Sequence, residues 1–317
     1  MNQRVMLQPV DAVDVTIVVD NFLDVLMPST EMVRRAPLVW DWAERDTLVA
    51  EHGYSLLVTV RKDDRTESLL FDAGLGRETA IHNLDVLGVR ISDLRTVALS
   101  HGHVDHHGGL EGIFRRVGRQ RMPLVLHPDA WRDRKIVFPT GTEIRMPPPN
   151  RSDLEREGVE VVEERGPSLL LDGMVLVTGQ VERVTDFEKG FPLQHARTQD
   201  GWEPDTWLWD DQPMVLNLKD KGLVVLSCCS HAGIINVLRH AQRMTGQEKV
   251  YAVIGGLHLT GGIFEPIIPR TLDELVAIGP EVVVPCHCTG WKATHELARR
   301  LPGAYVQTSV GTRLHFV

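Results

Sequence analysis

The sequence predicts an α/β fold, and two patterns carry this prediction. Short runs rich in Val, Ile and Leu recur along the 317 residues, and stretches with helical spacing of apolar residues separate them. Several of these runs end directly in a loop that carries histidine. With 43% hydrophobic and 24% charged residues, the composition is that of an ordinary globular protein, which excludes collagen-like and largely disordered chains.

Strands in the first half of the chain are predicted at residues 13–20, 54–61, 67–72 and 96–100. The second and third of these runs form a hairpin, because only a short polar turn separates them. A helix follows, since apolar residues recur at helical spacing between Ala80 and Leu87. The fourth run leads directly into His101.

The second half begins with another hairpin and then alternates strands with helices. The predicted strands are residues 214–219, 223–228, 250–255, 281–285 and 304–308, and the helices begin near Ala232, Thr271 and Lys292. Three of the strands lead to His231, His258 and His287. In open α/β sheets ligands bind beyond the carboxyl ends of the strands, so we expect these three histidines to share a cleft.

Two long segments, residues 21–52 and 179–213, show little periodicity and contain clustered Trp residues. Segments of this length are usually functional lids or binding loops, or else disordered. We expect them to act as lids, with plain packing of the Trp side chains as the alternative. The whole chain, 1–317, is expected to form one domain with similar halves of roughly 1–165 and 166–317.

The formal net charge of −9 comes from 34 Lys and Arg against 43 Asp and Glu, without long blocks of like charge. Such a chain offers no basic surface for nucleic acid or for an anionic membrane, so neither partner is expected. No apolar run is long enough for a membrane span, and Asp11 and Asp14 stand where a signal peptide would be apolar. We therefore expect a cytoplasmic protein with a small-molecule partner, and the oligomeric state stays open, a homo-oligomer included.

The strongest chemical signal is a His-x-His-x-Asp-His run formed by His101, His103, Asp105 and His106. Two imidazoles at positions i and i+2 of a tight loop can bind one metal ion, and the following carboxylate and imidazole can hold a second ion nearby. Imidazole and carboxylate ligands favour zinc, with iron or manganese as alternatives, over calcium or magnesium. The competing interpretation is a polar turn that caps the following helix.

This run resembles the signature of the metallo-β-lactamase superfamily, and further landmarks extend the resemblance over nearly the whole chain. They are the LFDAG segment (70–74), Cys229 after the later hairpin and His287 at the last strand end before the final helix. The resemblance implies an αβ/βα four-layer sandwich of two mixed sheets flanked by helices. It also implies a dinuclear metal site.

The same resemblance implies how the two divalent ions are held. It assigns one ion to His101, His103 and His231, and the other to Asp105, His106 and His287. Cys229 stands where many members carry a bridging Asp, so it offers a thiolate bridge or no bridge at all. Asp72 is a candidate hydrogen-bond partner for a ligating imidazole, or else a structural residue.

The four cysteines fall in two tight pairs, Cys228/Cys229 and Cys286/Cys288. A separate structural zinc site is one alternative, but these spacings differ from the usual Cys-x₂₋₄-Cys pairs. We also expect Cys286 and Cys288 to point away from His287, because neighbours on a strand face opposite sides. Small buried thiols that pack the sheet ends are the simplest interpretation.

Within the superfamily, the segments LSHGHVDHHGGL (99–110), CCSHAGIIN (228–236) and PCHCTG (285–290) resemble one subgroup of metal-dependent hydrolases, the 7,8-dihydropterin-6-methyl-4-(β-D-ribofuranosyl)aminobenzene-5′-phosphate synthase-like proteins. This implies a hydrolase, or a related transferase, that uses metal-activated water on a small anionic substrate such as a phosphorylated or pterin-like compound. In this scheme Asp105 orients the water, and His258 protonates the leaving group or binds the oxyanion. Arg183 is a candidate clamp for an anionic group.

Each of these roles has an alternative. His258 could be a packed pocket residue, and Arg183 an ordinary ion-pair residue. An RNase Z-like nuclease or phosphodiesterase would use the same centre, although the acidic chain has no basic stripe. A metal-containing ligand sensor without turnover is a further alternative, and Cys229 at the bridging position motivates it.

Overall fold

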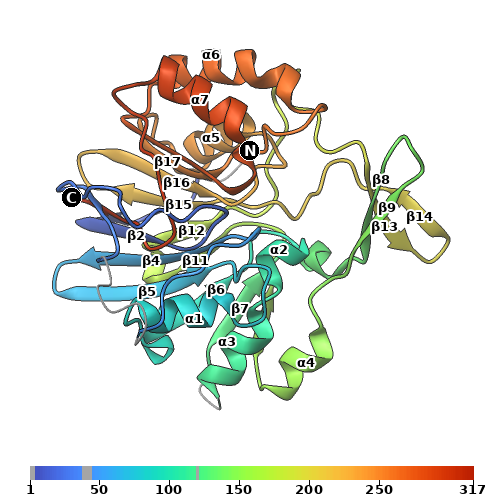
Figure 1. Ribbon diagram of the computed structural model, residues 1–317, viewed down its shortest axis with the longest axis horizontal. Helices are drawn as coiled ribbons and strands as arrows, with labels where there is room; N and C mark the ends of the chain where they lie inside the picture. The colour runs from blue at the N-terminus through green and yellow to red at the C-terminus, as the bar shows by residue number, and fades with distance from the viewer. Residues whose placement is uncertain (1–3, 38–44, 119–120) are drawn as a thin grey trace.

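Two β-sheets lie face to face at the centre of the molecule, and helices cover both outer sides (Figure 1). The computed structural model describes residues 4–37, 45–118 and 121–317. This arrangement is the predicted αβ/βα four-layer sandwich. Within these ranges, no helix combines the length and the hydropathy needed to cross a bilayer.

The first sheet combines strands from the N-terminal part of the chain with one strand from its end. Its order, among the described residues, is β10 (Glu160–Glu163), β7 (Pro123–Leu126), β6 (Leu94–Ala98), β5 (Arg65–Phe71), β4 (Ser55–Lys62), β2 (Ala12–Val19), β19 (Arg313–Phe316) and β3 (Val33–Arg34). Strands β2, β4 and β5 are antiparallel neighbours, whereas β6 and β7 continue the sheet in parallel. Helices α1 (Thr79–Val86) and α3 (Leu110–Val117) pack on its outer side.

The second sheet is built mainly from the C-terminal half. Its order is β11 (Ser168–Leu170), β12 (Val175–Val177), β15 (Met214–Leu218), β16 (Gly222–Ser227), β17 (Val250–Gly256) and β18 (Val282–Cys286), with β1 (Pro9–Val10) beside β15. Strands β16, β17 and β18 are parallel. The helices α5 (Ile234–Thr245), α6 (Ile268–Ile278) and α7 (Trp291–Arg300) cover its outer side.

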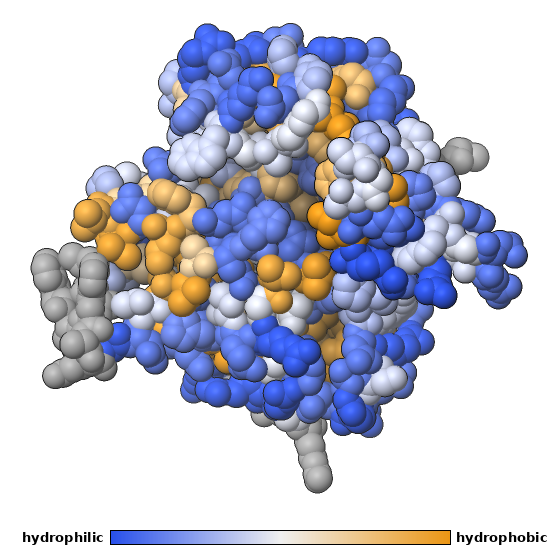
Figure 2. Space-filling model, turned by 45° about the vertical axis from the view of Figure 1, so that its right-hand side comes forward, coloured by the Kyte–Doolittle hydropathy of each residue, from blue (hydrophilic) through white to orange (hydrophobic). Residues whose placement is uncertain are grey.

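The central strands are apolar on both faces because both faces are covered. In β16, Val224 and Leu226 point into the core between the sheets, whereas Leu223 and Val225 point to the helices. Each fully buried Val or Leu side chain stabilises the fold by about 1.5–3 kcal/mol. The outer helices are mainly hydrophilic on the surface, and apolar residues on the face seen in Figure 2 gather mainly at mid-height, between the helical layers.

A smaller sheet projects from the sandwich, at the right of Figure 1. We call it the projecting sheet; its order is β14 (Gly201–Pro204), β13 (Gln194–Thr198), β8 (Arg134–Val137) and β9 (Glu143–Met146). The remaining described helices are short: α2 (Val104–His107), α4 (Arg151–Arg156), η1 (Ile91–Asp93), η2 (Pro128–Trp131), η3 (Leu171–Gly173), η4 (Glu265–Ile267) and η5 (His287–Thr289).

One predicted strand is wrong. Residues 304–308 meet β18 only through an isolated bridge between Tyr305 and Val283, among the residues that the structure describes. The final strand is β19, which pairs with β2 in the other sheet. An apolar run in the sequence does not show which sheet it joins or which strand it pairs with. The pairing of β19 with β2 could therefore not be predicted from the sequence.

The two long segments differ from plain loops. The segment over 179–213 contains β13 and β14, so much of it belongs to the projecting sheet. The segment over 21–52 contains β3, and the expected lid includes residues 38–44, which lie outside the described residues. The expected halves are interlocked, because β19 lies in the first sheet and β1 pairs in the second.

A buried ion-pair network ties the projecting sheet to the sandwich. The guanidinium of Arg134 is fully buried; its Nε donates to Asp205 at 2.8 Å, and its Nη atoms donate to Asp210 at 2.7 and 2.9 Å. Burial lowers the pKa of Arg134, but the two carboxylates outweigh it and raise that pKa above its usual value. Asp210 also accepts a hydrogen bond from the backbone nitrogen of Gly102 at 2.8 Å, so the network reaches the histidine loop.

We expect Arg134→Met to lower the free energy of unfolding by about 3–5 kcal/mol, because it leaves two buried carboxylates without their cation. Arg145→Met is the matched control, since Arg145 lies on the neighbouring strand with its side chain 57% exposed and paired to Asp133. The control should lose less than about 1 kcal/mol. Chemical denaturation of both variants tests this, and equal losses would contradict the assignment of the network.

Candidate metal centre

The predicted histidine loop lies between the end of β6 and helix α2. His101, His103 and His106 are all buried there. The loop packs closely against the turn that follows β5: a side chain at Gly108 would overlap the carbonyl oxygen of Leu75. A residue without a Cβ is therefore required at this position.

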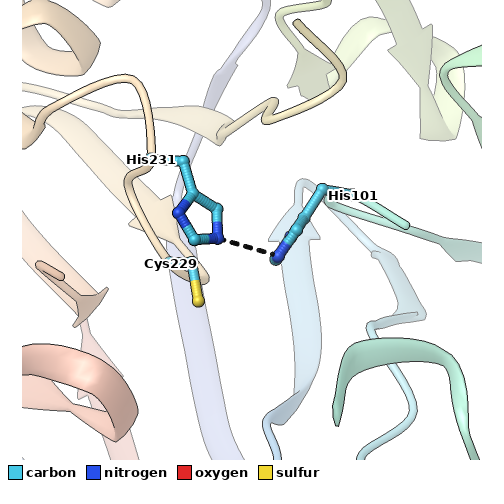
Figure 3. A group of neighbouring side chains, drawn as sticks. All are labelled: His101, Cys229 and His231. Atoms are coloured by element: carbon cyan, nitrogen blue, oxygen red, sulfur yellow. Dashed lines mark hydrogen bonds between the residues drawn. The ribbon is translucent and has the colours of Figure 1, made fainter. Parts of the chain in front are cut away.

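Residues far apart in the sequence gather around this loop. The ring centroid of His101 lies 4.6 Å from that of His103 and 4.2 Å from that of His106. His231, from the loop after β16, lies 4.8 Å from both His101 and His103 by ring centroid. Its Nε2 points directly at Nε2 of His101, at a distance of 3.2 Å (Figure 3). His231, which the sequence assigns to the same ion as His101 and His103, thus lies next to the loop.

His287 arrives from the end of β18. Its Nε2 lies 3.3 Å from Oδ2 of Asp105, and its ring centroid lies 5.0 Å from that of His106. The backbone of His287 has φ of 47°, in the left-handed region, and Asp20 and Asn21 hold it there. Oδ1 of Asp20 accepts from the His287 nitrogen at 2.8 Å, and Nδ2 of Asn21 donates to the His287 carbonyl at 2.9 Å.

Cys229 occupies the middle of the cluster. Its Sγ lies 3.2 Å from Nε2 of His106. Three groups of three donor atoms, each within 4.8 Å of one another, share this sulfur: Cys229 with His101 and His231, with His106 and His287, and with His258 and Cys288. Burial raises the pKa of the Cys229 thiol well above its usual range. A cation beside the sulfur would reverse this, since a coordinating thiol is deprotonated.

Cys288 is also part of the cluster, and the sequence analysis missed it. Its Sγ lies 3.4 Å from Sγ of Cys229. The expectation that Cys288 points away is wrong, because β18 ends at Cys286 and residues 287–289 form a 3₁₀ turn rather than a strand. Strand alternation therefore does not apply to Cys288. Cys286, which is still in the strand, packs in the core between the sheets.

Asp72 orients one of the imidazoles. Its Oδ2 lies 2.6 Å from Nδ1 of His106, so the other ring nitrogen of His106 is turned toward Cys229. Asp72 itself is held by the nitrogen and hydroxyl of Ser100, both at 2.7 Å. A carboxylate behind a histidine in this way fixes the ring and its tautomer in metal sites.

The protonation states suit metal ligands. Burial lowers the pKa of His103 to about 3 and holds the pKa values of His101 and His231 well below their usual range, so these rings are neutral. Burial also lowers the pKa of His106, but Asp105 and Asp72 outweigh it and raise that pKa to about 9. His106 therefore carries a proton that a bound cation would displace.

The donors fit a divalent metal ion. Several buried polar atoms lack a hydrogen-bond partner, among them Nε2 of His103, Oδ1 of Asp105 and both ring nitrogens of His287. Each buried unsatisfied group costs about 1–3 kcal/mol. Neutral imidazole, carboxylate and thiolate together form the donor set that zinc prefers. A cation at the cluster would satisfy Nε2 of His103 and one of the two ring nitrogens of His287.

A cavity of about 710 Å³ opens onto the cluster, with His103, Asp105, Cys229, His231 and His287 in its lining. His258 also lines it: its ring centroid lies 4.3 Å from that of His231, and its Nδ1 has no hydrogen-bond partner. His52, to which the sequence analysis gave no role, is a further lining residue; its Nε2 lies 3.8 Å from Oδ2 of Asp105.

Arg183 does not reach the cavity, so the expected anion clamp is not supported. Its Nη1 and Nη2 donate to the backbone carbonyls of Val181 and Trp207 at 2.6 and 2.5 Å, and the guanidinium lies over the ring of Trp209. Burial lowers the pKa of Arg183. These contacts indicate that Arg183 stabilises the loop that carries it.

Comparisons with known proteins agree with this geometry. The family model described as "Metallo-beta-lactamase superfamily" matches residues 49–189, which include the histidine loop. A 7,8-dihydropterin-6-methyl-4-(β-D-ribofuranosyl)-aminobenzene-5′-phosphate synthase from Methanocaldococcus jannaschii is 28% identical over 273 residues, which are 84% of this chain and 90% of that protein.

Solved structures share the fold over nearly the whole chain. Tm1679, described as a metal-dependent hydrolase of the β-lactamase superfamily, superposes with a TM-score of 0.73 at 23% identity, covering 95% of this chain and 98% of that one. Zn²⁺-bound PqqB from Methylobacterium extorquens gives a TM-score of 0.52 at 14% identity over 96% and 99% of the two chains. The histidine motif, the matched family model and the shared fold all make this chain similar to the metallo-β-lactamase superfamily.

Proposed function

We propose that this protein is a metal-dependent hydrolase of small molecules with a dinuclear zinc centre. One observation carries the proposal: two groups of buried donors, one with His101 and His231 and the other with His106 and His287, meet at the sulfur of Cys229. His103 and Asp105 complete the two sets, because both have buried atoms without partners beside these groups.

The named relatives support the same class of reaction. The description of Tm1679 names a metal-dependent hydrolase, and PqqB is described with bound Zn²⁺. The name of the archaeal relative points to a phosphorylated, pterin-bearing compound on the substrate or product side. We take from these names the class of chemistry and a small-molecule substrate.

The chain's own residues supply positioning and proton transfer. When bound, divalent metal ions supply Lewis acidity, which acidifies water and polarises the carbonyl or phosphoryl group under attack. Asp105 lies beside the donor group of His106 and His287 and turns Oδ2 toward it, so its Oδ1, which has no hydrogen-bond partner, can accept a hydrogen bond from the attacking water and orient it. His258, on the cavity wall, can donate a proton to the leaving group.

A polyanionic substrate fits this site less well. None of the cavity-lining residues that the structure describes is Lys or Arg. Nucleases bind the phosphate backbone mainly through such residues. The proposal therefore favours a small substrate over RNA or DNA.

Protein purified without chelator should contain about two zinc ions per chain, as expected for a dinuclear centre. His103→Ala should lower the metal content to one ion or fewer and abolish hydrolysis. His295→Ala is the control, because His295 is exposed on α7 and lies against Trp291. Elemental analysis by mass spectrometry measures this, and a metal-free wild type that hydrolyses substrate would overturn the proposal.

Cys229→Ser should remove most of the near-ultraviolet thiolate-to-metal absorption of the cobalt-substituted protein, because serine offers no soft ligand. It should also weaken cobalt binding by at least about tenfold. Cys286→Ser should leave the band unchanged, since Sγ of Cys286 donates to the carbonyl of Val284 within the core. An unchanged spectrum in the Cys229 variant would show that the sulfur is not a ligand.

His258→Gln should lower kcat by roughly 10²–10⁴-fold while the metal content stays that of the wild type, since general acid catalysis contributes a factor of this size. Substrates with a good leaving group, such as nitrophenolate, should be affected least, because they need no proton. A loss that is the same for good and poor leaving groups would argue against proton donation by His258.

A further inference from the structure

We propose that the substrate carries an uncharged apolar group, the size of an aromatic ring or a medium-length alkyl chain, beside the bond that is hydrolysed. The projecting sheet and the loops facing it form the binding wall for this group. The inference rests on the proposed hydrolase function and adds the class of substrate. It assigns a role in specificity to residues outside the metal centre.

The cavity has two chemically different parts. Its floor consists of the histidine, cysteine and Asp105 donors of the metal centre. The rest of its lining is mainly apolar: besides Asn21, His52, His258, Thr260 and three glycines, it consists of Ile136, Phe138, Pro139, Met146, Phe191, Leu193, Ile263, Phe264 and Trp291. The walls offer a large apolar surface next to the point where the bond would be cleaved, and ligand sites use such surfaces to bind apolar groups.

Strand alternation explains why the projecting sheet presents an apolar face here. Ile136 lies opposite Ile144 in the ladder of β8 and β9, and side chains two residues apart share a face, so Met146 is on the same side. The other face carries Lys135 and Arg145, whose charged groups lie 4.8 and 5.1 Å from the ring centre of Trp202. The sheet therefore turns Lys135 and Arg145 away from the cavity, whereas Arg134, on the same face as Ile136, is enclosed by Asp205 and Asp210.

The aromatic wall is continuous with the metal centre. Phe191 lies parallel to His231, with an interplanar angle of 9° and centroids 6.2 Å apart. Phe264 meets His258 edge-on at 4.4 Å and Phe191 at 5.4 Å. A group bound against these rings lies directly beside the reacting bond, where it can affect the rate as well as the affinity.

None of the described lining residues is Lys or Arg, and two arginines of the surrounding elements already have partners. Arg134 is enclosed by Asp205 and Asp210, and Arg183 donates to backbone carbonyls. An anionic group of the substrate would therefore depend on the metal ions, and the rest of the molecule meets apolar side chains. Three apolar side chains of the lining, Phe138, Ile263 and Trp291, are each at least 36% exposed to solvent. Ile144, which pairs with Ile136 of the lining, is exposed to at least the same extent.

Two pairs of compounds test the inference. Hydrolysis is compared for methyl and octyl 4-nitrophenyl phosphate, which share the reacting bond and the leaving group. Binding to the zinc-loaded protein is compared for methylphosphonate and octylphosphonate by calorimetry. We expect at least roughly tenfold higher kcat/KM and tenfold tighter binding for the octyl compounds, because each buried CH₂ group contributes severalfold.

The variant Ile136→Ala should lower the octyl preference by roughly threefold or more, since it removes part of the wall. Val137→Ala is the matched control on the same strand, because Val137 is not in the cavity lining, and it should keep the preference.

Equal kcat/KM and equal affinity for methyl and octyl compounds would overturn the inference while leaving the hydrolase intact. If neither phosphate ester is hydrolysed, the proposed function fails, and the phosphonate affinities still decide whether the apolar wall binds an alkyl group.

Discussion

The structure depends on the burial of imidazole, carboxylate and thiol groups around a single sulfur atom. Donors from the ends of β6, β16 and β18 approach within 4.8 Å of one another there, and several lack any hydrogen-bond partner. Groups of this kind would destabilise an ordinary core, because each loses its hydration without replacement. A bound cation would replace the lost hydration of the atoms that point toward it, so the cluster fits a metal site.

The surrounding chain holds this arrangement through carboxylates placed at strand ends and loops. Asp72 orients the ring of His106, Asp20 holds the strained backbone of His287, and Asp210 binds the backbone of the histidine loop at Gly102. The Asp20 carboxyl is buried, and this burial raises its pKa to about 6. Since Asp210 also pairs with Arg134 of β8, the same network fixes the projecting sheet relative to the metal centre.

The sequence predicted what depends on local pattern. The strands that lead into His101, His231 and His287 were identified because apolar β-branched runs stop at those loops, and the superfamily signature is itself local. It could not predict contacts between distant segments: Asp20 and His287 are 267 positions apart, and only the folded chain shows that they meet. A carboxylate at the end of the predicted strand 13–20 was the available signal for Asp20.

Other differences have equally specific causes. Cys288 joined the cluster because the strand ends at Cys286 and gives way to a 3₁₀ turn, whereas alternation holds only if residues 286–288 are all strand. The strands β13 and β14 were missed because their residues are largely polar and because β8, the other strand that pairs with β13, lies far back in the chain. Arg183 was placed in the site on residue type alone, and the carbonyls that bind its guanidinium cannot be seen in the sequence.

X-ray absorption at the zinc edge tests the central claim most directly, because it reports the ligands of the bound metal without requiring a substrate. The account predicts imidazole nitrogen ligands at about 2.0 Å, a sulfur contribution near 2.3 Å from Cys229, and a second metal at roughly 3.5–4 Å. Loss of the sulfur signal in Cys229→Ser would identify the shared atom. A spectrum with four sulfur ligands, or with a single isolated zinc and no sulfur, would contradict the account.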